Sequence, residues 1–231
     1  MRVYQSVLGP IVSPYGYDGA NLPLFKTIIA DPPWPYKGGG RGAPVGTGGR
    51  GGDGTTKNGR KIIQTSAGEH YNLMSLDDIM EMGISEIVSS EAHLYLWTTN
   101  SFMEHAYEVM SRWGFDFKTI VTWVKIKKGT VLEPSMKTGY YFRSATEHVL
   151  FGTRGNLRLA ETAGTPTAFF AERLEHSRKP EAIYKMAEEQ SPAPRLELFA
   201  RRLRDGWYSF GNELNVTLTG APADAIEHGH G

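Results

Sequence analysis

A carboxylate, two prolines and an aromatic ring directly follow a short apolar run near the start of the chain. Residues 27–30 (TIIA) are apolar or β-branched, as expected of a buried strand, and Asp31, Pro32, Pro33 and Trp34 come next. Because proline has no amide N–H, it cannot continue a central strand, so the strand must end here. In open α/β sheets, ligands bind at the carboxyl ends of strands. The sequence therefore predicts a ligand site at Asp31.

The chemistry that suits these groups is methyl transfer to an exocyclic amine such as that of adenine. The lone pair of this amine is delocalised into the ring, which makes it a poor nucleophile. Two acceptors facing its two N–H groups would favour the form that can attack, and the Asp31 carboxylate and the Pro32 carbonyl are two such acceptors. Trp34 or Tyr36 would give the base a surface to stack on. The competing interpretation is a proline-rich turn with Trp34 in the core.

At these residues the chain resembles the DPPW-type N6-adenine methyltransferases, the MT-A70 (MTA-seventy) family. The similarity continues in the family's order through residues 70–75 (HYNLMS), 96–100 (LWTTN), 147–152 (EHVLFG), 178–180 (RKP), 196–201 (LELFAR) and 211–213 (GNE). The resemblance implies an α/β, Rossmann-like, S-adenosylmethionine-dependent methyltransferase fold. Its order is permuted, with the catalytic motif before the cofactor motif, and the chain looks like a bacterial or phage member.

The predicted site residues divide by role. The catalytic set is Asp31, Pro32, Pro33 and Trp34. The substrate-binding set, which adds ring-clamping aromatics, is Tyr36, His70, Tyr71 and Asn100. The cofactor-binding set is Ala30, Asp31, Arg143, His176, Arg178, Lys179, Phe199, Arg201, Asn212 and Glu213.

Two parts of the cofactor set have a physical rationale of their own. Asn212 and Glu213 follow a predicted strand, where amide and acid side chains suit ribose hydroxyls, although a polar turn would look the same. The cations before Pro180 stand at a predicted helix start, which favours a carboxylate, although an ordinary capped helix with solvated cations would look the same. The resemblance makes this segment the element that binds the carboxylate of S-adenosylmethionine. Some relatives carry a cofactor-contacting lysine where this chain has Thr146, and Arg143 would replace it.

Composition sets the class of protein. The chain has 231 residues, 40% of them hydrophobic, and 25 basic side chains against 25 acidic ones. A neutral balance still allows a local basic patch for nucleic acid. The absence of cysteine excludes disulfides and thiolate metal sites, and no metal is expected. Without a signal peptide or an apolar run of membrane-spanning length, the expectation is a soluble, cytoplasmic protein.

The chain divides into an N-terminal arm (1–23), a methyltransferase domain (24–214) and a disordered tail (215–231). Within the domain, residues 37–60 hold 11 of the 27 glycines and five basic residues against one acid. Such a segment cannot bury enough apolar surface to order itself. It is either a flexible linker or a lid whose cations contact phosphates.

Alternating strand and helix patterns predict a doubly wound sheet. We expect helices over residues 75–82 with Ser75 as N-cap, over 101–113 with a capping box of Ser101 and Glu104, and from Pro180 onward. Further strands are expected at residues 92–98, 119–125, 146–151, 195–200 and 207–210. His148, inside an apolar strand, is read as a core histidine rather than a general base.

The prediction is an S-adenosylmethionine-dependent N6-adenine methyltransferase that acts on nucleic acid. DNA is favoured over RNA because the single compact domain resembles bacterial and phage members. N4-cytosine transfer is the first alternative, although its motif usually carries serine at the position of Asp31. A catalytically silent, nucleic-acid-binding subunit is the second, although such a subunit would be expected to lose the motif. A homodimer is possible.

Overall fold

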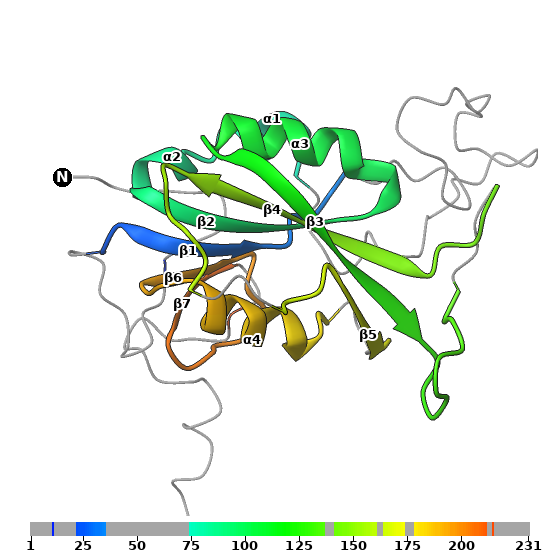
Figure 1. Cartoon of the computed structure of the whole chain (residues 1–231). Helices are drawn as coiled ribbons and strands as arrows, with labels where there is room; N and C mark the ends of the chain where they lie inside the picture. Colours follow the sequence, from blue (N-terminus) through cyan, green and yellow to red (C-terminus); the bar gives the residue numbers. More distant parts are fainter. Residues whose placement is uncertain are drawn as a thin grey trace, which may run out of the picture.

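The computed structural model describes residue 11 and residues 22–35, 74–136, 141–160, 164–173, 178–211 and 214 (Figure 1). Its centre is a seven-stranded sheet of order β5-β3-β4-β2-β1-β6-β7. The strands are β1 (Phe25–Ala30), β2 (Val88–Thr98), β3 (Asp116–Ile126), β4 (Thr146–Arg154), β5 (Ala168–Glu172), β6 (Arg195–Leu198) and β7 (Trp207–Phe210).

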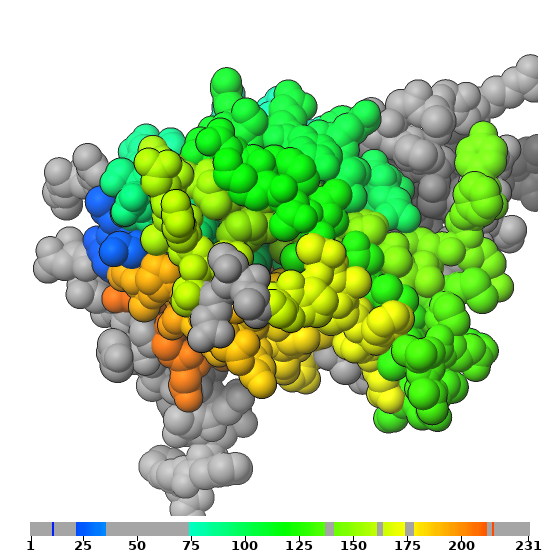
Figure 2. All heavy atoms as spheres, in the orientation of Figure 1, coloured from blue at the N-terminus to red at the C-terminus, as the bar shows by residue number. Residues whose placement is uncertain are grey.

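β4 runs antiparallel to its neighbours β2 and β3, whereas all other neighbouring strands pair in parallel. The carboxyl ends of the six parallel strands therefore share one edge of the sheet with the amino end of β4. In Figure 2, β1 (blue) and the β6–β7 segment (orange) lie side by side although they are far apart in the sequence.

Helices cover both faces of the sheet (Figure 1). The helical elements are α1 (Leu76–Met80), α2 (Ile84–Ile87), the 3₁₀ turn η1 (Asn100–Phe102), α3 (Met103–Arg112) and α4 (Glu181–Gln190). α1 and α3 pack on one face, where the larger hydrophobic cluster lies, and α4 packs on the other over a second cluster. This three-layer arrangement confirms the Rossmann-like α/β fold class. No helix of the described part of the chain is long and apolar enough to cross a membrane.

The helix starts follow local chemistry, with one exception. Ser75 caps α1 as predicted, and it forms a capping box with Asp78. The predicted capping box of Ser101 and Glu104 is wrong. Ser101 lies inside η1, and α3 begins at Met103 after Phe102, which caps it without a side-chain hydrogen bond. The 3₁₀ turn η1, and not a serine cap, leads into the first turn of α3.

β1 to β4 are longer than predicted, β7 has the predicted bounds, β6 ends two residues earlier than predicted, and two elements were missed. β2 and β3 each span 11 residues, and β5 and α2 had no prediction. β5 is an edge strand of five residues, too short for a clear alternating pattern. The glycine-rich segment 37–60, the tail 215–231 and most of the arm 1–23 lie outside the described residues, so the domain limits stay predictions. Ile11 of the arm is buried in the larger cluster.

Candidate active site

Asp31 lies where the sheet geometry predicts a ligand site. It directly follows β1, a central strand between β2 and β6, at the edge where the parallel strands end. Ile28 and Ile29 of β1 are buried in the hydrophobic clusters on opposite faces, which fixes the strand. The Asp31 side chain emerges from this core with 24% of its surface exposed. A carboxylate is thus held on a rigid element and still reachable from solvent.

The two prolines form a tight turn closed by Trp34. The Trp34 amide donates to the Pro32 carbonyl at 2.8 Å, and the Trp34 indole N–H donates to the Trp97 carbonyl on β2 at 3.1 Å. The Trp34 ring stacks on Phe102, with centroids 5.6 Å apart, and is only 3% exposed. Trp34 therefore anchors the turn in the core. It does not offer a base the stacking surface that we expected, because its side chain is almost fully buried.

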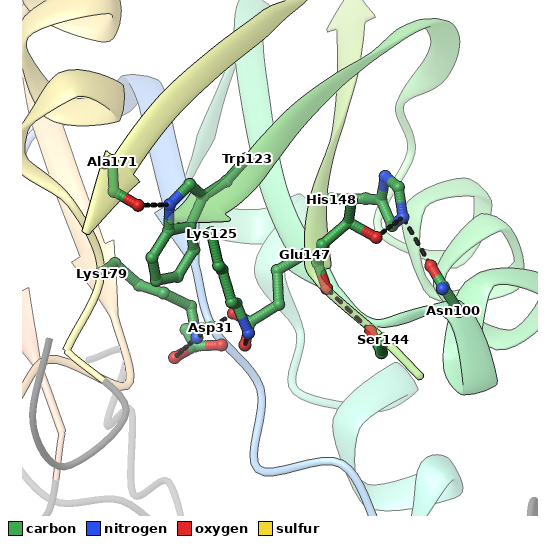
Figure 3. Close-up of polar contacts among 10 residues, drawn as sticks. Asp31, Asn100, Trp123, Lys125, Ser144, Glu147, His148, Ala171 and Lys179 are labelled. Carbon is green, nitrogen blue, oxygen red and sulfur yellow. Dashed lines mark hydrogen bonds and ion pairs between the residues drawn. The ribbon is translucent and has the colours of Figure 1, made fainter. Parts of the chain in front are cut away.

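Four alternating charges occupy this edge of the sheet (Figure 3). The Lys179 ammonium lies 2.8 Å from Asp31 Oδ2 and 3.2 Å from Glu147 Oε2. The other Glu147 oxygen, Oε1, accepts a hydrogen bond from Lys125 Nζ. The result is a continuous network, Lys125–Glu147–Lys179–Asp31, which links β3, β4, the segment before α4 and the end of β1. We call these four side chains the charge network.

Two indole rings lie against the ammonium groups of the charge network. The Lys179 ammonium lies 5.2 Å from the centre of the Trp97 ring, and the Lys125 ammonium lies 4.9 Å from that of Trp123. The two rings meet edge to face, 6.1 Å apart, and the Trp123 indole N–H donates to the Ala171 carbonyl of β5 at 3.0 Å. Contact of each ammonium with an indole ring partly compensates for its lost water.

The charges of the network stabilise one another against burial. Burial would lower the pKa of Lys179, but the carboxylates of Asp31 and Glu147 outweigh it and raise the pKa. Burial would likewise raise the pKa of Glu147, but Lys179 and Lys125 hold it below its usual value. For Lys125, burial prevails and lowers the pKa, although Glu147 opposes the shift. Glu147 is therefore ionised at neutral pH despite being 13% exposed.

Asn100 belongs to a separate cluster on the other face of the sheet. His148 follows Glu147 on β4, and successive strand residues project to opposite faces. His148 Nε2 donates to the Asn100 side-chain oxygen at 2.6 Å, and its Nδ1 accepts from the Thr122 hydroxyl at 3.1 Å. Burial lowers the pKa of His148, so the ring is neutral at pH 7. Figure 3 shows Asn100 and His148 pointing away from Asp31, so the structure does not join Asn100 to the charge network.

The predicted cofactor residues that the structure describes lie along the same edge. Ala30, at the end of β1, is fully buried, and Lys179 is the cation of this group that reaches Asp31. Arg178 is exposed and pairs with Glu181 at 3.4 Å. Arg143 is exposed in the segment before β4, and Lys125, not Arg143, supplies the second cation beside Glu147.

The loop after β6 has an unusual backbone. Phe199 takes the left-handed conformation with φ 63°. A Cβ at Gly211, which follows β7, would come within 2.1 Å of the Ala200 carbonyl oxygen. Only glycine lets these two loops touch, so the carboxyl ends of β6 and β7 are held together. Arg201, half-buried, continues the first loop.

Six predicted site residues lie outside the described residues. They are Tyr36, His70, Tyr71, His176, Asn212 and Glu213. Their assignments to the substrate and the cofactor stay predictions.

Sequence reasoning missed two members of the charge network. Glu147 was quoted only as part of a motif, and Lys125 was read as the last residue of a strand. A signal was present in both cases, because each is a charged residue near one end of its strand, beside a mostly apolar stretch. Such a residue is buried at a functional site or paired across the sheet. Their pairing across β3 and β4 could not be read from one sequence.

Comparison with known proteins gives concordant matches. The family model described as MT-A70 matches residues 25–213. The chain is 30% identical over 193 residues to the Type II methyltransferase M.MunI of Mycoplasma sp, which covers 82% of this chain and 78% of that protein.

Two further relatives are N(6)-adenosine-methyltransferases. A probable MT-A70-like N(6)-adenosine-methyltransferase of Oryza sativa subsp. japonica is 33% identical over 148 residues, 63% of this chain and 21% of that protein. The N(6)-adenosine-methyltransferase catalytic subunit METTL3 of Homo sapiens is 29% identical over 148 residues, 63% of this chain and 25% of that protein. The chain therefore spans only about a fifth to a quarter of these longer relatives.

Proposed function

Because the chain belongs to the MT-A70 family, we propose that it is a methyltransferase that transfers a methyl group from S-adenosylmethionine to the N6 amine of adenine in nucleic acid, with DNA as the preferred substrate. The observation that carries this proposal is the position of Asp31. A partly exposed carboxylate stands at the carboxyl end of a central strand, in a turn fixed by Trp34, beside a buried ammonium.

Asp31 and Pro32 are suited to hold the amine. The Asp31 carboxylate accepts one N–H of the adenine amine, which favours the pyramidal nitrogen whose lone pair can attack. The Pro32 carbonyl accepts the Trp34 amide through one lone pair, and its second lone pair remains for the other N–H. The amine nitrogen would form a bond to the methyl carbon as the methyl–sulfur bond of the donor breaks with its electron pair left on sulfur, and the amine proton would pass to water beside the partly exposed Asp31. Because both acceptors belong to one rigid turn, they need no rearrangement to meet the base.

The residues of the cofactor edge fit S-adenosylmethionine, which supplies an activated methyl group when bound. An ammonium has three N–H donors, and Lys179 directs two of them to Asp31 and Glu147. A carboxylate is the partner that suits the third donor. Ala30, Phe199 and Arg201 border the same edge, and we propose that Asn212 and Glu213 bind the ribose. Lys179 would thus hold the cofactor carboxylate and Asp31 at once.

Two observations bear on the choice of substrate. The match to M.MunI, a Type II methyltransferase, runs along most of both chains, whereas the N(6)-adenosine-methyltransferases match over a small part of their length. This difference favours DNA over RNA. A base inside a duplex would have to flip out of the stack to reach Asp31. A homodimer and a cytoplasmic location remain predictions.

Replacing Asp31 tests the proposal. Asp31→Ala should lower the rate of adenine methylation by about a hundredfold or more, which is typical of losing one preorganised acceptor. Calorimetry should show S-adenosylmethionine affinity within a few-fold of the parent protein, because Lys179 keeps Glu147 as a partner. Asp31→Asn keeps the shape of the side chain but loses its charge. Its methylation rate should lie between those of the parent protein and Asp31→Ala. Near-parental methylation by Asp31→Ala would refute the assigned role.

A further inference from the structure

Lys125 is a buried cation that the proposed chemistry does not yet use. Its side chain is 4% exposed and lies in β3, on the α4 face of the sheet. Its backbone is pinned from both sides, since its N–H donates to the Ala145 carbonyl at 2.8 Å and its carbonyl accepts from the Ser135 amide at 2.7 Å. The backbone position of Lys125 is therefore fixed. Its ammonium has one carboxylate partner among the described residues, Glu147.

Lys125 and Lys179 divide the two oxygens of Glu147 between them. Oε1 faces Lys125, and Oε2 faces Lys179, which also contacts Asp31. If Lys125 were absent, Lys179 would be the only cation among the described residues that pairs with both carboxylates. A buried carboxylate without sufficient counter-charge takes up a proton instead. Glu147 would then become neutral, and Lys179 would pair with Asp31 alone.

We propose that Lys125 is a positioning residue for the methyl transfer: it holds the Glu147 carboxylate in place so that Lys179 is shared between Glu147 and Asp31 and is not bound to Asp31 alone. Lys125 does not contact Asp31, so it acts through Glu147. An Asp31 that is not fully engaged by Lys179 keeps lone pairs for the adenine amine. This inference rests on the proposed methyl transfer at Asp31.

The test compares three variants over pH 6–9. Lys125→Met should lower kcat at pH 7 more than it raises KM, and kcat should recover toward pH 9 as Glu147 loses its proton. Each unit by which the pKa of Glu147 rises moves the acid limb of the kcat profile by about one pH unit. Lys125→Arg keeps the charge and should restore the parental profile. Lys127→Met is the matched control, because Lys127 pairs with Glu133 at an exposed site outside the network.

Among the described residues, few charged groups act on this part of the network, so the kcat profile can be interpreted. Glu147 is faced by Lys125 from β3, by Lys179 from the segment before α4 and, through Lys179, by Asp31. Arg173, after β5, acts on Lys125 at longer range, and His148, the next residue of β4, is neutral over most of the tested range. Glu197 of β6, whose pKa burial raises, also acts on Asp31, but it is present in the parent and in every Lys125 variant. An acid limb that appears in Lys125→Met and not in the parent is therefore assigned to Glu147, and Glu147→Gln should remove it.

A second measurement does not depend on activity. The difference in Tm between Lys125→Met and the parent should widen from pH 5 to pH 8. In the parent, Lys125 favours the ionised form of Glu147. In Lys125→Met, the folded protein holds a proton on Glu147 that the unfolded chain releases, so its stability falls as pH rises. If Lys125→Met fails to fold, the double variant Lys125→Met/Glu147→Gln should fold, because both charges are removed together.

The outcomes separate the two proposals. A flat kcat profile in Lys125→Met with an unchanged Tm difference, or an equal loss in Lys125→Arg, would overturn the role of Lys125 while leaving the methylation itself intact. If the parent protein does not methylate adenine, the proposed function fails. The pH dependence of Tm would then still show whether Lys125 holds Glu147 ionised.

Discussion

Lys179→Met removes the ammonium that lies 2.8 Å from Asp31 and 3.2 Å from Glu147. Methionine keeps the length of the apolar stem, so the change is mainly electrostatic. Removing one partner of a buried ion pair typically costs 3–5 kcal/mol, and we expect about 3 kcal/mol at pH 7.5. The lower end applies because Lys125 still compensates Glu147 and because 24% of the Asp31 side chain is exposed. For a domain of this size, the loss corresponds to a fall in Tm of roughly 6–12 °C.

The loss should depend on pH in a defined way. The pKa of Glu147 lies below its usual 4.5, so its stabilising contribution is present above that pH and disappears as pH falls through the folded-state value. The pKa of Lys179 lies above its usual 10.5, so its contribution is present below that pH and disappears as pH rises through the folded-state value. The effect of Lys179→Met is therefore largest between these two limits and shrinks toward pH 3.

Urea unfolding at pH 7.5 and pH 3 would measure this difference. Lys185→Met is the control, because Lys185 is 77% exposed and only pairs with Glu189 at 3.8 Å on the surface of α4. Surface pairs of this kind contribute about 0.3–0.5 kcal/mol. Equal losses for the two variants at pH 7.5, or a Lys179→Met loss that stays constant down to pH 3, would refute the charge network as described.

Three further results are expected. Trp34→Phe should destabilise the protein by about 1–3 kcal/mol, measured by thermal unfolding, because the buried Trp97 carbonyl loses its indole donor. Gly211→Ala should weaken S-adenosylmethionine binding by calorimetry, because the new Cβ would meet the Ala200 carbonyl oxygen at 2.1 Å and push the two loops apart; unchanged affinity would place the cofactor elsewhere. The Glu181 carboxyl should titrate near pH 2 by NMR, because hydrogen bonds from two arginines lower its pKa to about 2, and a normal titration would show that these contacts do not persist in solution.

The end of β1 and the position of Asp31 could be predicted because their signals are local, whereas the order of the strands in the sheet was not predicted. An apolar run that ends in two prolines fixes both the end of β1 and the residue beyond it. The Ser75 cap was readable for the same reason, since a capping box acts within one turn, whereas the predicted Ser101 cap fails because η1 precedes α3. β5 was not readable, because a five-residue edge strand acquires its conformation from pairing with β3.

The partners of Asp31 could be predicted only in part. Lys179 was expected at the cofactor site, but its contacts with Asp31 and Glu147 depend on how α4 packs against the sheet. The pairing of Lys125 with Glu147 depends on the register of β3 against β4, where Trp123 lies opposite Glu147. Trp34 was misjudged as a stacking surface because its type suits both roles, and only its contact with Phe102 shows that it is buried.

The measurement that tests the central claim most directly is mass spectrometry of nucleosides from DNA and RNA incubated with the protein and S-adenosylmethionine labelled in its methyl group. If Asp31 holds the adenine amine during methyl transfer, DNA should yield labelled N6-methyldeoxyadenosine. Asp31→Ala should yield much less of it. Labelled N4-methylcytosine would contradict the assignment of the base, and label in RNA alone would contradict the preference for DNA. No label in either nucleic acid, from a folded protein that binds the cofactor, would contradict the account as a whole and favour a silent binding subunit.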